Sequence, residues 1–188
     1  TRVGRLIAEQ CGRQLIGCSL ELGGKNALVV RADVNVDRAA DTAVRACFAN
    51  SGQLCISMER MYVHTDVWDR FVPRFVERVQ SMNLQAAVGW GADMGSLISA
   101  RQLATVTRHV EDAVSAGATV LAGGRARPDS GPYVFEPTVL TDVTDAMEVC
   151  RNETFGPVVS VYRVRDDDEA VARANDTSYG LNASVLTG

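Results

Sequence analysis

Short apolar segments alternate along this chain with longer segments whose apolar residues repeat with the spacing of one helix face. Between residues 66 and 82 an apolar side chain recurs every fourth position, and residues 99–116 show the same repeat. The expected strands are at residues 27–30, 60–64, 118–121, 134–140, 158–164 and 181–186, and the expected helices at residues 1–15, 37–50, 66–82, 99–116 and 166–175. Such alternation predicts βαβ units, and therefore an α/β fold with a mainly parallel sheet flanked by helices.

The size and composition of the chain agree with one large folded domain. It has 188 residues, of which 46% are hydrophobic and 22% charged, and these values exclude a disordered or fibrous chain. Nineteen basic and 23 acidic residues give a net charge of -4, so no dense basic surface is expected and nucleic acid is not a predicted partner. Neither a membrane-spanning apolar run nor a signal peptide is recognised, and we therefore expect no membrane partner and a cytoplasmic location.

The cysteines and histidines do not have the spacing of a disulfide framework or a metal site. The five cysteines are odd in number, they form no CxxC pair, and no metal ligand is predicted. Cys11, Cys18 and Cys47 fall on apolar faces and are expected in the core. His64 and His109 are 45 positions apart without a matching carboxylate pattern, which disfavours a histidine-based triad.

Cys55 is the strongest candidate for a nucleophile. It lies between a predicted helix and a predicted strand, in the connection 51–57. A thiol on such a connection can be accessible to solvent and close to free backbone amides, which lower a thiol pKa and favour the nucleophilic thiolate. The alternative is a buried structural cysteine, since most free cysteines pack in the core.

Two further segments carry unusual residues. Glu21 lies between two leucines and ahead of a Gly-Gly pair, and burial there would raise its carboxyl pKa and favour a general base. The alternative for Glu21 is a surface glutamate at a strand end. Lys25 follows the same turn and is the single lysine among 19 basic residues. Residues 153–157, with the sequence Glu-Thr-Phe-Gly-Pro, form either an ordinary turn or a functional loop ahead of the most β-branched strand.

Taken together, Leu20–Asn26, Gly52–Cys55 and Glu153–Pro157 resemble the motif set of the aldehyde dehydrogenase family, in the same order. The spacing is 34 positions from Glu21 to Cys55 and 98 positions from Cys55 to Glu153. The similarity runs along essentially the whole chain. It is greatest to the succinate-semialdehyde dehydrogenases, and the fold that it implies is the catalytic domain of this family.

The resemblance implies a role for four residues. Cys55 would attack an aldehyde to form a thiohemiacetal and then a thioester, and Glu21 would activate the water that hydrolyses the thioester. Glu153 would hold the nicotinamide ribose hydroxyls of NAD or NADP, and Phe155 would pack near the nicotinamide ring. The implied reaction is the oxidation of a small aldehyde, succinate semialdehyde being the expected one, to its carboxylic acid.

The resemblance also implies that this chain is one part of a longer enzyme. In the family, a dinucleotide-binding region and a second oxyanion donor precede the position of Thr1. We therefore expect residues 1–20 to be a trailing helix and strand of the cofactor-binding domain and residues 21–188 to be the catalytic domain. The chain alone is expected to have little or no dehydrogenase activity, and the full-length enzyme is expected to be a homo-oligomer.

The substrate assignment and two other functions remain open at this stage. Succinate-semialdehyde enzymes with the usual pattern have an arginine six residues before the nucleophile, where this chain has Ala49, and Arg45 is a weak substitute one helical turn earlier. One alternative is a non-catalytic structural domain of the same family. Another is a cysteine hydrolase, which would need His64 or His109 close to Cys55.

Overall fold

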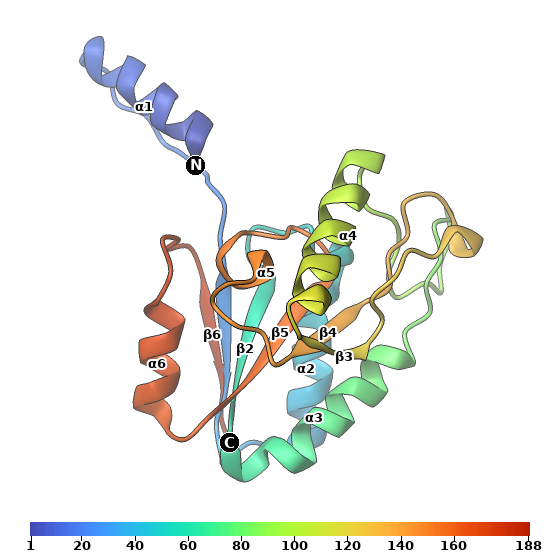
Figure 1. Cartoon of the computed structure of the whole chain (residues 1–188). Helices are drawn as coiled ribbons and strands as arrows, with labels where there is room; N and C mark the ends of the chain where they lie inside the picture. The colour runs from blue at the N-terminus through green and yellow to red at the C-terminus, as the bar shows by residue number, and fades with distance from the viewer.

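A single six-stranded sheet, in the order β3-β4-β5-β2-β1-β6, organises the computed structural model, which describes all residues 1–188 (Figure 1). The strands are β1 (Asn26–Val30), β2 (Met58–His64), β3 (Thr119–Ala122), β4 (Thr138–Thr141), β5 (Val158–Val164) and β6 (Ala183–Leu186). The β3–β4 pair is antiparallel and every other pair of neighbours is parallel. The predicted α/β fold with a mainly parallel sheet is therefore confirmed.

Helices cover both faces of this sheet. The helices of the chain are α1 (Arg2–Arg13), α2 (Val36–Phe48), α3 (Thr65–Gln80), α4 (Ala100–Ser115), α5 (Glu148–Arg151) and α6 (Asp167–Asn175), of which α1 lies away from the sheet. Two short 3-10 turns, η1 (Ala49–Gly52) and η2 (Pro128–Ser130), complete the secondary structure. Alternate residues of β1 point to opposite faces: Leu28 packs with α2 and α3, whereas Val29 packs on the side of α6. None of the helices is long and apolar enough to cross a membrane.

The apolar stripe of α3 explains why this helix forms where the spacing predicts it. Its four apolar residues at every fourth position are at most 1% exposed and face the sheet. Pro73 lies inside α3, and the helix continues past it to Gln80. Pro73 is on the exposed side of the helix, where water can hydrogen-bond the carbonyl that a proline leaves without a donor.

Three expectations from the sequence are wrong in detail. Residues 16–20, expected as a strand, form none, because no strand lies beside them to complete a hydrogen-bonded ladder. The strand expected at 134–140 begins only at residue 138. Cys18 is exposed and Cys11 is half-buried, whereas Cys47 is in the core as expected.

The start of the chain projects from the rest of the molecule. Figure 1 shows α1 well away from the sheet, joined to β1 by an extended segment. Three apolar side chains of α1, Val3, Leu6 and Ile7, are 59%, 54% and 46% exposed. The apolar face of α1 therefore lacks a partner within this chain.

Candidate active site

The three motif segments meet at one edge of the sheet. They immediately precede β1, β2 and β5, which are parallel and adjacent, and therefore enter the sheet from the same side. The Gly24 N–H donates a 2.8 Å hydrogen bond to Glu153 Oε1, and Asn26 Nδ2 donates a 2.7 Å bond to the Cys55 carbonyl. These two contacts join residues that are 129 and 29 positions apart in the sequence.

The loop that carries Cys55 has a strained and well-anchored backbone. Asn50, Ser51 and Gly52 have φ values of 52°, 58° and 68°, three consecutive residues in the left-handed region. Ser51 Oγ donates to the Gly95 carbonyl at 3.0 Å. Gln53 Oε1 accepts the Ile98 N–H at 2.8 Å. Hydrogen bonds from the side chains of the loop to backbone groups outside it thus hold a backbone conformation that costs free energy locally.

Cys55 itself is exposed, in contrast to Cys47 in the core. Burial raises the pKa of the Cys47 thiol strongly, which disfavours its thiolate. The backbone N–H of Cys55 donates no hydrogen bond to the chain. This N–H is available to a reacting oxygen next to the sulfur.

Asn26 is a contributor to the site to which the sequence analysis assigned no role. Its side chain is buried and donates both to the Cys55 carbonyl and, at 2.9 Å, to the Ser57 carbonyl. The Asn182 N–H donates to Asn26 Oδ1 at 3.2 Å. One amide at the start of β1 thus fixes the backbone at Cys55 and at Ser57. The sequence signal for it is a polar residue at the first position of an otherwise apolar strand.

Glu153 is half-buried and faces the glycine turn. Burial raises the pKa of its carboxyl group, and the hydrogen bond from the Gly24 N–H opposes this shift. A Cβ atom at Gly23 would lie 2.4 Å from Glu153 Oε2, so the absence of a side chain there makes room for the carboxylate. Oε2 makes no hydrogen bond within the chain and can accept one from a ligand hydroxyl.

The environment of Glu21 differs from the buried setting that favours a general base. Glu21 is exposed and makes no ion pair or hydrogen bond. It lies in the segment between α1 and β1, which forms neither a helix nor a strand. Of the two alternatives that the sequence left open for Glu21, the structure gives the surface position.

Lys25 is buried and forms an ion pair with Glu59 on β2, their side chains being 1% and 5% exposed. The carboxylate of Glu59 also accepts the backbone N–H groups of Thr154 and Phe155, at 2.9 Å and 3.0 Å. Phe155 has a φ of 50° and is half-buried. None of the expectations from the sequence involves Glu59.

Neither histidine is placed to activate Cys55. His64 ends β2, at the opposite end from the Cys55 loop. His109 is buried on α4, with Nδ1 3.1 Å from Thr154 Oγ1, and burial lowers its pKa. A cysteine hydrolase that depends on one of these histidines is therefore not supported.

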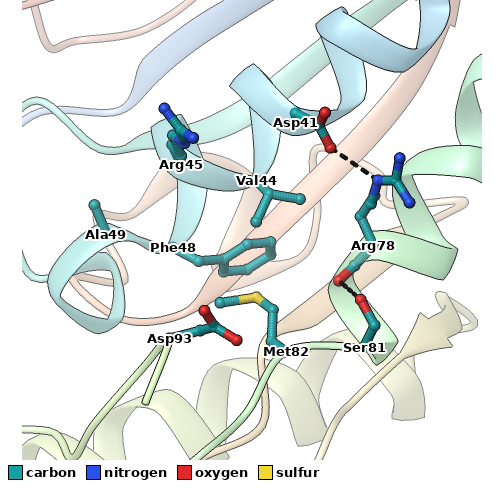
Figure 2. A pocket seen from close by; sticks show the side chains of 9 residues that line it. All are labelled: Asp41, Val44, Arg45, Phe48, Ala49, Arg78, Ser81, Met82 and Asp93. Carbon is teal, nitrogen blue, oxygen red and sulfur yellow. Dashed lines mark hydrogen bonds and ion pairs between the residues drawn. The ribbon is translucent and has the colours of Figure 1, made fainter. Parts of the chain in front are cut away.

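A separate pocket of about 540 Å³ lies between α2 and α3 (Figure 2). Phe48 and Met82 supply apolar lining, and Ala49 and Arg45 belong to its wall on the side of α2. Arg45 is exposed and makes no ion pair or hydrogen bond with the chain. Its guanidinium is available to an anion.

Comparisons with known proteins place this site in context. The model of the aldehyde dehydrogenase family matches residues 1–188. A Mycolicibacterium smegmatis protein, provisionally named succinate-semialdehyde dehydrogenase (NADP+), is 60% identical over 188 residues, which are 100% of this chain and 36% of that relative. The present chain thus spans about a third of the length of such relatives.

Solved structures agree with this match. Succinate-semialdehyde dehydrogenase from Burkholderia pseudomallei superposes with a TM-score of 0.93 at 35% identity, over 100% of this chain and 39% of that one. Betaine aldehyde dehydrogenase from Staphylococcus aureus, solved with NAD+, gives 0.92 at 30% identity over 99% and 37%. Because the family model matches the whole length of the chain, the chain belongs to the aldehyde dehydrogenase family.

Proposed function

We propose that this chain supplies the nucleophile, the general base and a cofactor contact for the NADP-dependent oxidation of succinate semialdehyde. The observation that carries the proposal is the exposed thiol of Cys55 at the sheet edge where the Glu153 loop and the glycine turn also meet. The family membership supports the reaction class, and the names of the relatives support the aldehyde and the cofactor.

In this proposal Cys55 acts first. Its sulfur attacks the aldehyde carbon to form a thiohemiacetal, and the free N–H of Cys55 donates a hydrogen bond to the carbonyl oxygen. Held at Glu153, the nicotinamide cofactor would supply the hydride acceptor that this oxidation requires, and Cys55 would then carry the thioester. Glu21 takes a proton from the water that hydrolyses the thioester, and its exposed position lets water reach it. The products are the carboxylic acid, NADPH and a proton, and the thiol is regenerated.

The proposed cofactor contact is at Glu153. Its unpaired Oε2 next to Gly23 suits a ribose hydroxyl, because a carboxylate oxygen accepts such a proton and no side chain of residue 23 blocks the approach. Phe155, on the same loop as Glu153, would pack near the nicotinamide ring. NADP is favoured over NAD by the names of the relatives.

The proposed substrate carries a carboxylate, and Arg45 is our candidate for binding it. The chain has Ala49 where the usual pattern has an arginine, and Arg45 lies one helical turn earlier on the wall of the same pocket, without a partner. We also propose that residues 1–20 belong with a cofactor-binding domain and residues 21–188 form the catalytic domain. The exposed apolar face of α1 supports this division. A cytoplasmic location and a homo-oligomeric assembly stay predictions.

An acylation experiment tests the proposed nucleophile without any cofactor. p-Nitrophenyl acetate should release a burst of about one equivalent of p-nitrophenol per chain as the acetyl group is transferred to Cys55. The burst should disappear in Cys55→Ala and persist in Cys18→Ala, which removes another exposed thiol. Equal bursts in both variants, or no burst in the unmodified chain, would contradict the assignment, and the non-catalytic alternative would then be preferred.

A further inference from the structure

Glu59 stands between two of the motif segments and contacts both. Its buried carboxylate pairs with Lys25 of the glycine turn and accepts the N–H groups of Thr154 and Phe155 from the Glu153 loop. Ionised carboxylates accept stronger hydrogen bonds than neutral groups do. Since Thr154 and Phe155 belong to no helix or strand, Glu59 supplies the partners that their buried amides require.

We propose that Glu59 is a positioning residue that fixes the Glu153 loop relative to the glycine turn. The inference rests on the proposed function, in which Glu153 holds the cofactor ribose. Glu59 holds the residue that follows each partner of the Gly24–Glu153 hydrogen bond. It pairs with Lys25, which follows Gly24, and accepts the N–H of Thr154, which follows Glu153. One carboxylate therefore sets both the donor and the acceptor of that contact.

Other side chains hold the glycine turn and the Glu153 loop on the sides that face away from Glu59. Gln102 Nε2 donates to the carbonyls of Thr154 and Phe155, at 2.9 Å each, from α4. Arg60, whose side chain points to the other face of β2, donates to the Lys25 carbonyl at 2.9 Å and 2.6 Å. Only Glu59 joins the glycine turn directly to the Glu153 loop from within the sheet.

Lys25 supplies the counter-charge that this arrangement needs. A buried carboxylate without a compensating cation is strongly unfavourable, and the Lys25 ammonium is 1% exposed and directed at Glu59. Removing either partner alone would change charge and geometry together. A test of positioning must therefore keep the pair neutral and vary only the hydrogen-bond acceptor.

Two double variants meet this requirement. Lys25→Met with Glu59→Gln keeps a neutral pair and an acceptor oxygen, whereas Lys25→Met with Glu59→Met keeps neutrality and size but removes the acceptor. Amide hydrogen exchange at Thr154 and Phe155 should be faster in the second variant by roughly tenfold or more. In the first variant and the unmodified chain, the Gly24 amide signal should follow the titration of Glu153 with pH; in the second it should not.

Equal exchange rates in the two double variants would overturn the proposal. If the second variant does not fold, amide exchange in the unmodified chain decides between the outcomes. Exchange at Thr154 and Phe155 as fast as in the exposed residues 88–90 would refute the proposal, and strong protection of both amides would support it. Glu136→Gln, which changes another ion-paired and mostly buried glutamate, should leave both amides unchanged. These readouts do not depend on Cys55, so a failed acylation experiment would leave them interpretable.

Discussion

Replacing Gly52 with alanine should destabilise the chain through the contact between the two active-site loops. A Cβ atom at this position would lie 2.1 Å from the Gly156 carbonyl oxygen and 2.5 Å from its carbon, and neither atom can rotate away because both are backbone. A non-glycine residue in the left-handed region costs about 1–2 kcal/mol. Forcing extra volume into a packed contact adds about 1–3 kcal/mol. The expected loss in the free energy of unfolding is therefore about 2–5 kcal/mol.

Thermal and urea unfolding followed by circular dichroism would measure this loss. For a domain of this size the expected decrease in Tm is roughly 4–20 °C. Gly117→Ala is the matched control, because Gly117 also has a positive φ, 102°, but has no atom within 4 Å of the added Cβ. It should show the conformational cost alone. If Gly52→Ala is no less stable than Gly117→Ala, close packing of the two loops is not what requires a glycine there.

Three further predictions follow from burial and charge. Iodoacetamide should alkylate Cys55 at least roughly tenfold faster than Cys47, because Cys47 is buried and its thiol pKa is raised; peptide mass spectrometry measures both, and equal rates would contradict an accessible nucleophile. Lys25→Met should lower the free energy of unfolding by about 3–5 kcal/mol in urea titrations, because it leaves Glu59 buried without a counter-charge, and a loss below about 1 kcal/mol would contradict that. Glu153→Gln should unfold at a Tm equal to or above that of the unmodified chain at pH 7. The folded-state pKa of Glu153 is raised, so its favourable contribution to stability is present at low pH and is lost as the pH rises through that pKa. The difference in Tm between the variant and the unmodified chain should therefore shrink in acid. A variant that is less stable than the unmodified chain at pH 7 would contradict the direction of this effect.

The fold was predictable to the extent that burial of a single face determines an element. The bounds of α3 and α4 lie within two residues of those expected, because each helix buries one long apolar stripe. Hydrophobicity alone could not delimit β4, since the run at 134–137 is also buried but pairs with no strand of the sheet. The four residues of α5 are too few to show a helical repeat.

The site was predictable in its motifs and not in its supporting contacts. Cys55 and the loop of Glu153 stand out because unusual residues occur where a connection meets a strand. Glu59 does not, because the partners that explain it lie 34 positions before and 95 positions after it. Its one local signal is the pair of charged residues Glu59 and Arg60 at the start of an otherwise largely apolar strand. The leucines on either side of Glu21 are half-buried, and Leu22 lies against Gly4 of α1, while Glu21 itself is exposed.

Local strain at this edge of the sheet is balanced by contacts from the rigid elements behind it. Asn50, Ser51 and Phe155 all have positive φ, a conformation that non-glycine residues adopt at a cost. Gln102 of α4 and Glu59 of β2 hold the loop of Phe155. The Cys55 loop is held by Asn26 at the start of β1 and by the backbone of Gly95 and Ile98. All of these anchors belong to the same chain as the loops. Changes at the anchors should therefore disturb the geometry around Cys55 as effectively as changes in the loops themselves.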